Sequence, residues 1–140
     1  MKIILTSAAA LLLSLAAVAA PSGDPVPAAV LAAFSKQFPD VKKTKWEKEG
    51  DRYEAEFKMA GKETSATFSA DGQWLETETK IAVAELPQAA RDYVAQHFAG
   101  KKIREAAKIT ASDGKVTFEA EVRNKDLIFD ANGAYLNTTD

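Results

Sequence analysis

The sequence contains one structural unit written twice. The segment YEAEF at 53–57 returns as FEAEV at 118–122, and the segments 67–79 and 128–140 align with the same turn glycine and aromatic positions. A single unit of this size buries too little surface to be stable on its own. Two units joined edge to edge would remove two exposed strand edges and extend the core. The duplication therefore predicts one domain built from two similar halves.

Each unit begins with the pattern of an amphipathic helix. Val30, Leu31, Phe34 and Phe38 fall at helical spacing on one face. Pro39 prevents the helix from continuing and biases the preceding residue away from helical geometry. The sequence ELPQAARDYVAQHFAG repeats this helix at the start of the second unit.

After each helix the pattern changes to alternation with a period of two. In YEAEF the odd positions are apolar and the even positions are glutamates, as a strand with one buried and one solvated face requires. Glycine-containing turns separate the alternating runs. We expect four antiparallel strands in each unit, at 41–48, 52–60, 63–70 and 73–80, and at 103–111, 115–123, 126–130 and 134–139.

These patterns predict an α+β fold: a tandem α-β4 duplication forming one eight-stranded antiparallel sheet with two helices on one face. The expected boundaries are 26–80 for the first repeat, 81–85 for a connector and 86–140 for the second repeat. The expected core is Phe34, Phe38, Val94 and Phe98 against Tyr53, Phe57, Phe68, Phe118, Val122 and Phe129. The other face, open to water, would carry Lys43, Lys45, Glu54, Glu56, Ser65, Thr67, Glu119 and Glu121.

The first residues have the features of a cleaved signal peptide. Lys2 precedes an apolar run, and the small residues at 17–19 suit cleavage after Ala19. Residues 20–25 would then be a short lead, and the mature protein would be periplasmic or secreted. The chain has no cysteine, so disulfides, a lipid-modified N-terminal cysteine and thiol chemistry are excluded. Losing Lys2 leaves 17 basic and 20 acidic residues, a net charge of −3, so nucleic acid is not an expected partner.

The order of these motifs resembles the PepSY-like proteins, also described as β-lactamase-inhibitor-like, which are exported by bacteria. The resemblance rests on VPxxVxxAFxxxFP, a strand bearing tryptophan, YEAEF, FxxxGxWLxTE and the ELP that opens the second helix, and it runs from Val26 to Leu136. It implies a tandem α-β4 fold whose open sheet face grips a protein partner. The chain lacks the disulfides of the true β-lactamase inhibitory proteins, so inhibition of that enzyme is not implied.

Catalytic patterns are weak. His97 is the only histidine, and its place near the end of the second helix suits a polar residue that interacts with the helix dipole. No serine stands in a nucleophile motif. The glutamate pairs at i, i+2 have the ordinary spacing of a solvated sheet face. We therefore expect no catalytic residues, no cofactor and no enzyme activity.

Calcium binding is an alternative. Asp130-Ala131-Asn132-Gly133 resembles the start of a calcium loop, but its glycine comes at the fourth position and no closing glutamate follows. A weaker site could combine Asp71, Glu76, Asp130 and Asn132. In that case the protein would sense calcium or another small ligand.

Two aromatic residues follow turn glycines at equivalent positions, Trp74 and Tyr135. A two-residue loop would send Trp74 to the open face, whereas a three-residue loop with a bulge would pair it with Phe68 and send it to the core. The core is favoured for both, and for Trp46. If the rings were outside, they would anchor a partner.

The sequence thus favours a non-enzymatic binding module whose open face recognises a protein or peptide, with an exported enzyme as one candidate partner. The candidate contact residues are Lys43, Lys45, Glu54, Glu56, Thr67, Trp74, Glu119, Glu121 and Tyr135.

Overall fold

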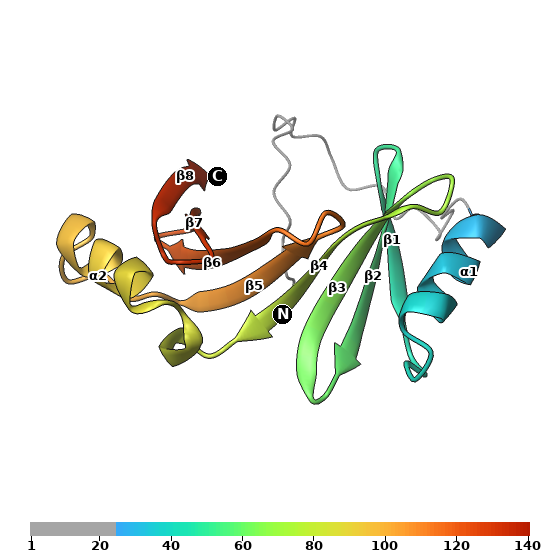
Figure 1. Cartoon of the computed structure of the whole chain (residues 1–140), viewed down its shortest axis with the longest axis horizontal. Helices are drawn as coiled ribbons and strands as arrows, with labels where there is room; N and C mark the ends of the chain where they lie inside the picture. The colour runs from blue at the N-terminus through green and yellow to red at the C-terminus, as the bar shows by residue number, and fades with distance from the viewer. Residues whose placement is uncertain (1–24) are drawn as a thin grey trace, which may run out of the picture.

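The computed structural model describes residues 25–140. In chain order they form α1 (Ala28–Gln37), β1 (Lys45–Glu49), β2 (Arg52–Met59), β3 (Lys62–Ser69), β4 (Trp74–Ile81), a 3₁₀ turn η1 (Val83–Glu85), α2 (Gln88–His97), β5 (Glu105–Ala111), β6 (Val116–Val122), β7 (Lys125–Asp130) and β8 (Tyr135–Thr139) (Figure 1). The predicted signal peptide at 1–19 lies outside the described residues. None of the helices in the described part combines the length and the apolar character needed to cross a membrane.

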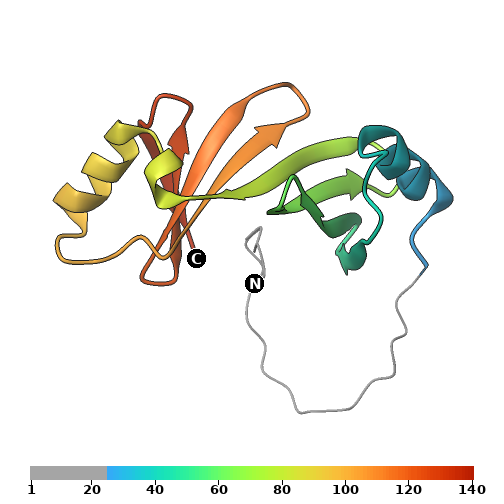
Figure 2. The ribbon, with the colours of Figure 1, turned by 90° about the horizontal axis from the view of Figure 1, so that it is seen from below.

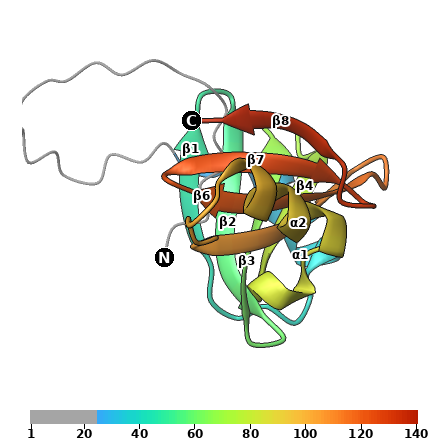
Figure 3. The same ribbon diagram turned by 90° about the vertical axis from the view of Figure 1, so that its left-hand side faces the viewer.

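The eight strands form one antiparallel sheet in which each strand pairs with its sequence neighbours, in the order β1 to β8. The two halves are joined where β4 pairs with β5, from Glu76–Ala111 to Ile81–Ala106. The strands of the first half run at a steep angle to those of the second half (Figures 1 and 3), because strand twist accumulates across a wide sheet. The prediction of a duplicated α-β4 fold with one eight-stranded sheet is confirmed.

Both helices cover the same face of the sheet. Tyr53 pairs with Phe68 in the first half, and Phe118 pairs with Phe129 in the second. The Ile81–Ala106 pair continues this face across the junction. Val30 and Phe34 of α1 pack on the first half, while Ala90 and Val94 of α2 pack on the second. The helices lie at opposite ends of the molecule (Figure 2), so the sheet bends away from them and its other face lies inside the bend.

The core residues expected from the sequence are found in two clusters, one in each half. Phe34, Phe38, Tyr53, Phe57 and Phe68 belong to the first cluster, and Val94, Val122 and Phe129 belong to the second, with Phe98 and Phe118 packed against it. The expectation for Leu31 is wrong, because 43% of this residue is exposed. Leu31 lies beside Val30 on α1, but the sheet covers the Val30 side only.

The first strand is shorter than expected. Residues 41–44 form no ladder with β2, and the first pair is Lys45–Glu56. Lys43 therefore stands before the strand rather than on a sheet face, which corrects its predicted position. The alternation of the sequence does not show where the segment leaves the ladder.

Two equivalent glycines let the β3–β4 and β7–β8 turns pack directly on the first turn of a helix. Gly72 has a φ of +89°, and a Cβ added there would lie 2.7 Å from the carbonyl oxygen of Ala29. Gly133 has a φ of +88°, and its Cβ would lie 2.9 Å from the backbone nitrogen of Ala90. Both the conformation and the close contact therefore require glycine.

We expect Gly72→Ala and Gly133→Ala each to lower the free energy of unfolding by roughly 2–3 kcal/mol, from backbone strain and displacement of the helix. Gly114→Ala is the matched control, because Gly114 also has a positive φ, of +85°, but nothing lies within 4 Å of an added Cβ. Urea denaturation of the three variants measures the difference. Equal losses at all three sites would show that contact with the helices contributes nothing.

Candidate functional site

The open face, defined as the side of the sheet opposite the two helices, collects side chains that are dispersed in the sequence. One row across it runs from Glu47 through Glu54 and Thr67 to Glu76. The next row runs from Lys45 through Glu56 and Ser65 to Glu78 and continues to Ile109 on β5. Alternation in the strands thus directs most of their glutamates to one side.

The sheet separates charge strongly. Twelve acidic residues of the strands lie on the open face: Glu47, Glu49, Glu54, Glu56, Glu63, Glu76, Glu78, Glu105, Glu119, Glu121, Asp126 and Asp130. Four basic residues lie there: Lys45, Arg52, Lys58 and Lys80. The rest of residues 25–140 carries seven acidic and thirteen basic residues. The open face therefore has eight excess negative charges when fully ionised, and the remainder has six excess positive charges.

The centre of the open face is not open to water, which corrects the sequence-based expectation. Glu54 is 3% exposed, Glu78 is 1% exposed, and Ser65 and Thr67 are also buried. This face lies inside the bend of the sheet, so side chains from several strands shield one another. Curvature of this kind is a property of the assembled sheet and leaves no signature in strand alternation.

Several buried polar atoms at this centre have no hydrogen-bond partner. They include Glu54 Oε1, Ser65 Oγ, Thr67 Oγ1 and Glu78 Oε2. An unsatisfied buried polar atom costs about 1–3 kcal/mol. The centre of the open face therefore holds unused acceptors and two hydroxyl groups.

Burial and mutual repulsion raise the pKa values of the central carboxyl groups. The pKa of Glu54 rises to about 7, chiefly through burial and then through Glu49 and Glu56. The pKa of Glu119 rises to about 8, through burial and then through Asp126 and Glu121. Burial also raises the pKa of Glu78 well above its ordinary value, with Glu119 and Glu54 contributing next. Glu54 and Glu119 therefore bind protons near neutral pH.

Three ion pairs lie towards the margins of this face. Lys45 Nζ lies 3.5 Å from Glu56 Oε2, and Arg104, just before β5, lies 3.1 Å from Glu121 Oε1. Lys80 lies 3.7 Å from Glu105. Such exposed pairs contribute about 0–1 kcal/mol each. The central carboxyl groups are therefore less neutralised than those at the margins.

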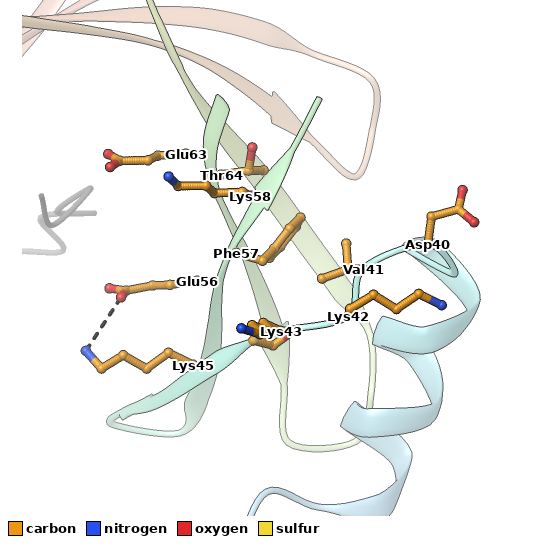
Figure 4. A pocket seen from close by; sticks show the side chains of 11 residues that line it. Asp40, Val41, Lys42, Lys43, Lys45, Glu56, Phe57, Lys58, Glu63 and Thr64 are labelled. Atoms are coloured by element: carbon orange, nitrogen blue, oxygen red, sulfur yellow. Dashed lines mark ion pairs between the residues drawn. The ribbon is translucent and has the colours of Figure 1, made fainter. Parts of the chain in front are cut away.

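The structure places Lys45, Glu54, Glu56, Thr67, Glu119 and Glu121 on the open face, as the sequence predicted. Their role in binding stays a prediction. Lys43 instead lines a separate hollow of 740 Å³ between residues 40–45 and strands β2 and β3, together with Val41, Phe57 and Lys58 (Figure 4). No pattern in the sequence indicated this hollow, because it arises where the chain leaves the sheet.

Trp74 and Tyr135 are on the helix-covered face, so their inclusion among the open-face contacts is wrong. A bulge pairs Phe68 with Trp74, as the three-residue loop predicted, and the indole Nε1 donates to Thr77 Oγ1 at 2.9 Å. The equivalent bulge pairs Phe129 with Tyr135. The ring of Tyr135 stacks on Tyr93 at 4.6 Å.

Trp46 also lies on the helix-covered face, as favoured from the sequence. Its ring meets Phe34 edge to face, with 5.2 Å between centroids. Large aromatic rings are therefore packed beneath α1 in the first half.

The side chain of His97, at the end of α2, contacts Tyr93. Its ring stacks on Tyr93 with 4.0 Å between centroids, and its Nδ1 lies 2.9 Å from the carbonyl oxygen of Tyr93. A serine or threonine nucleophile is not among these contacts. The geometry thus agrees with the interpretation of His97 as a helix-end residue.

The four residues of the calcium alternative do not come together. Asp71 accepts a hydrogen bond from the hydroxyl of Ser69, and Asp130 Oδ1 accepts from the backbone N–H groups of Asn132 and Ala134. Glu76 is on β4, and Asp130 is on β7, three strand spacings or roughly 14 Å away. In residues 25–140, no three histidine or acidic side chains are placed to hold a metal ion.

Solved structures with the same fold come from several Bacteroides species. A protein of Bacteroides fragilis described as BLIP-like is 25% identical, with a TM-score of 0.72, covering 85% of this chain and 89% of its own. A protein of Bacteroides eggerthii described as periplasmic is 20% identical, with a TM-score of 0.75, covering 83% and 89%. A DUF2874 family protein of Bacteroides ovatus is 21% identical, with a TM-score of 0.74, covering 84% and 89%.

No curated protein matches the sequence. The profile of the family described as "Putative beta-lactamase-inhibitor-like, PepSY-like" matches residues 18–63 and 51–137. Together these matches cover most of the chain, including all the strands that form the open face except the end of β8. The protein therefore belongs to the PepSY-like family.

Proposed function

We propose that this protein is a non-enzymatic binding module of the periplasm that uses the open face of its sheet to hold another exported protein. The observation that carries the proposal is the buried, incompletely hydrogen-bonded group of carboxyl and hydroxyl side chains at the centre of that face. Arranging this group costs stability, and a bound partner would offset the cost by supplying hydrogen-bond donors. The inhibitor-like family description supports a protein as the partner.

The location also has support from relatives. The Bacteroides eggerthii protein with the same fold is described as periplasmic. The predicted signal peptide of this chain agrees with export to that compartment. An exported enzyme is the partner class that the BLIP-like description of the Bacteroides fragilis protein favours.

A pair of matched substitutions tests the open face without changing charge. Ile109 lies on the open face of β5, opposite Glu78 and Thr117, whereas Leu31 is exposed on α1. Ile109→Trp adds bulk to the proposed binding surface, and Leu31→Trp adds bulk elsewhere. The mature protein and both variants would be immobilised and exposed to a periplasmic extract of the source cells.

We expect Ile109→Trp to lose at least 90% of the specifically captured protein, while Leu31→Trp retains it. Circular dichroism and melting temperature establish that both variants are folded. Equal capture by all three proteins would place the binding surface elsewhere, and no specific capture by the unmodified protein would count against a binding role.

A further inference from the structure

The chemistry of the partner follows from the separation of charge. Although the net charge of the whole chain is only −2, the open face concentrates the acidic residues and the rest of the surface is basic. An approaching molecule therefore meets a negative surface on one side of the protein only. Complementary charge raises the association rate and suppresses partners of the wrong sign.

The open face also has a strip along β5 that is bordered by longer, mostly acidic side chains of β4 and β6, with Lys80 of β4 opposite Ala107 and Thr117 of β6 opposite Ile109. β5 contributes Ala107 and Ile109 to this strip. Glu78 on β4 lies opposite Ile109, and Glu119 on β6 lies opposite Ala107. The rows on β4 and β6 are two strand spacings apart, about 10 Å, and β5 runs between them.

Buried acceptors point to positively charged donors. Glu78 is 1% exposed, and its Oε2 has no hydrogen-bond partner. The same is true of Glu54 Oε1, in a side chain that is 3% exposed. A carboxylate buried without a cation is costly, and hydrogen bonds from ammonium or guanidinium groups are the strongest that it can accept.

The spacing favours organic cations over a metal ion. Glu54, Glu78 and Glu119 stand on β2, β4 and β6, two strand spacings apart in each step, so the backbones of neighbouring members are at least about 10 Å apart. Within the described part of the chain, no three of them converge on one point. Lysine and arginine have long stems with a terminal charge, so successive residues of one segment can each reach a separate carboxylate.

We infer that the open face takes an extended segment rich in lysine and arginine, which lies along β5 and places its cationic groups on Glu78 and Glu119. The inference rests on the proposed function and names the chemistry of the partner that this function requires. Glu54 extends the acidic surface towards β2, so that a third cation of the segment has an acceptor there.

Binding of a defined peptide tests the inference with purified protein. The probe is a fluorescently labelled ten-residue peptide in which lysine alternates with threonine, and its counterpart replaces each lysine by glutamate. Fluorescence anisotropy would be measured at pH 8.5 in 50 mM and 300 mM salt. We expect saturable binding of the lysine peptide that weakens more than tenfold at the higher salt, and no binding of the glutamate peptide.

Two matched double variants distinguish the contribution of the strip to peptide binding from the contribution of the overall charge. Glu78→Gln with Glu119→Gln removes two carboxylates from the strip, while Asp51→Asn with Asp92→Asn removes two from exposed positions outside it. We expect the first pair to weaken binding of the lysine peptide at least tenfold and the second pair by less than twofold. Ile109→Lys, which adds a cation to the strip, should weaken binding as strongly as the first pair.

Equal weakening by both pairs, or no binding of the lysine peptide to the unmodified protein, would overturn the inference. The proposed function is judged separately. If Ile109→Trp abolishes capture of a periplasmic protein but the lysine peptide does not bind, the open face is the binding surface and the assigned chemistry is wrong.

Discussion

Replacing Phe68 or Phe129 by alanine is expected to lower the free energy of unfolding by about 3–5 kcal/mol. Both side chains are 0% exposed, and they occupy equivalent places in the two halves. The ring of Phe68 lies 6.2 Å from those of Phe34 and Trp46. The ring of Phe129 meets Tyr93 edge to face at 5.7 Å. Each truncation would leave a large cavity between a helix and the sheet.

Urea denaturation followed by tryptophan fluorescence and by far-ultraviolet circular dichroism measures these losses. Leu136→Ala is the control, because 46% of Leu136 is exposed, and we expect it to cost less than about 1 kcal/mol. Since β4 and β5 join the halves in one sheet, both phenylalanine variants should shift a single transition seen by both probes. A variant in which one half unfolds well before the other would contradict this coupling.

The second large effect is a loss of stability as the pH rises. The pKa of Glu54 is about 7 and that of Glu119 about 8 in the folded protein, compared with an ordinary value of 4.5. Because these values are raised, folding is favoured while the groups are protonated. That contribution is complete below pH 4.5 and is lost as the pH rises through 7 to 8. We expect a loss on the order of 3–5 kcal/mol between pH 5 and pH 9.

The variant carrying Glu54→Gln, Glu78→Gln and Glu119→Gln should lose most of this pH dependence and be more stable than the unmodified protein at pH 9. Amide groups keep the size of the side chains and remove the ionisation. Asp51→Asn is the control at an exposed turn, and it should leave the curve unchanged. Melting temperatures across this pH range measure the effect, and a parallel decline in the triple variant would exclude these three groups as its cause.

Much of the fold could be predicted because its signals are local and occur twice. Alternation identified the buried residues of YEAEF and FEAEV, and the aligned turns identified the duplication. The position of Trp74 required one further fact, whether the turn contains a bulge. The sequence allowed both possibilities because a change of one residue in register reverses every side chain that follows.

The character of the open face was harder to predict. The spacing of Glu76 and Glu78, or of Glu119 and Glu121, shows that each pair shares a face. It does not show that carboxyl groups of β2, β4 and β6 influence one another, as Glu54, Glu78 and Glu119 do. That influence depends on the order of the strands and the bend of the sheet. The exposed position of Leu31 and the departure of Lys43 from the ladder depend on the same long-range arrangement.

The junction of β4 with β5 shows how a further strand could be added to this sheet. It joins the last strand of one half to the first strand of the next, which is a head-to-tail arrangement without rotational closure. By the same geometry, β8 of one molecule could add to β1 of another and build an endless ribbon. β1 has only five residues, and four of them, Lys45, Glu47, Lys48 and Glu49, are charged. Such a short, charged border discourages the addition of a further strand.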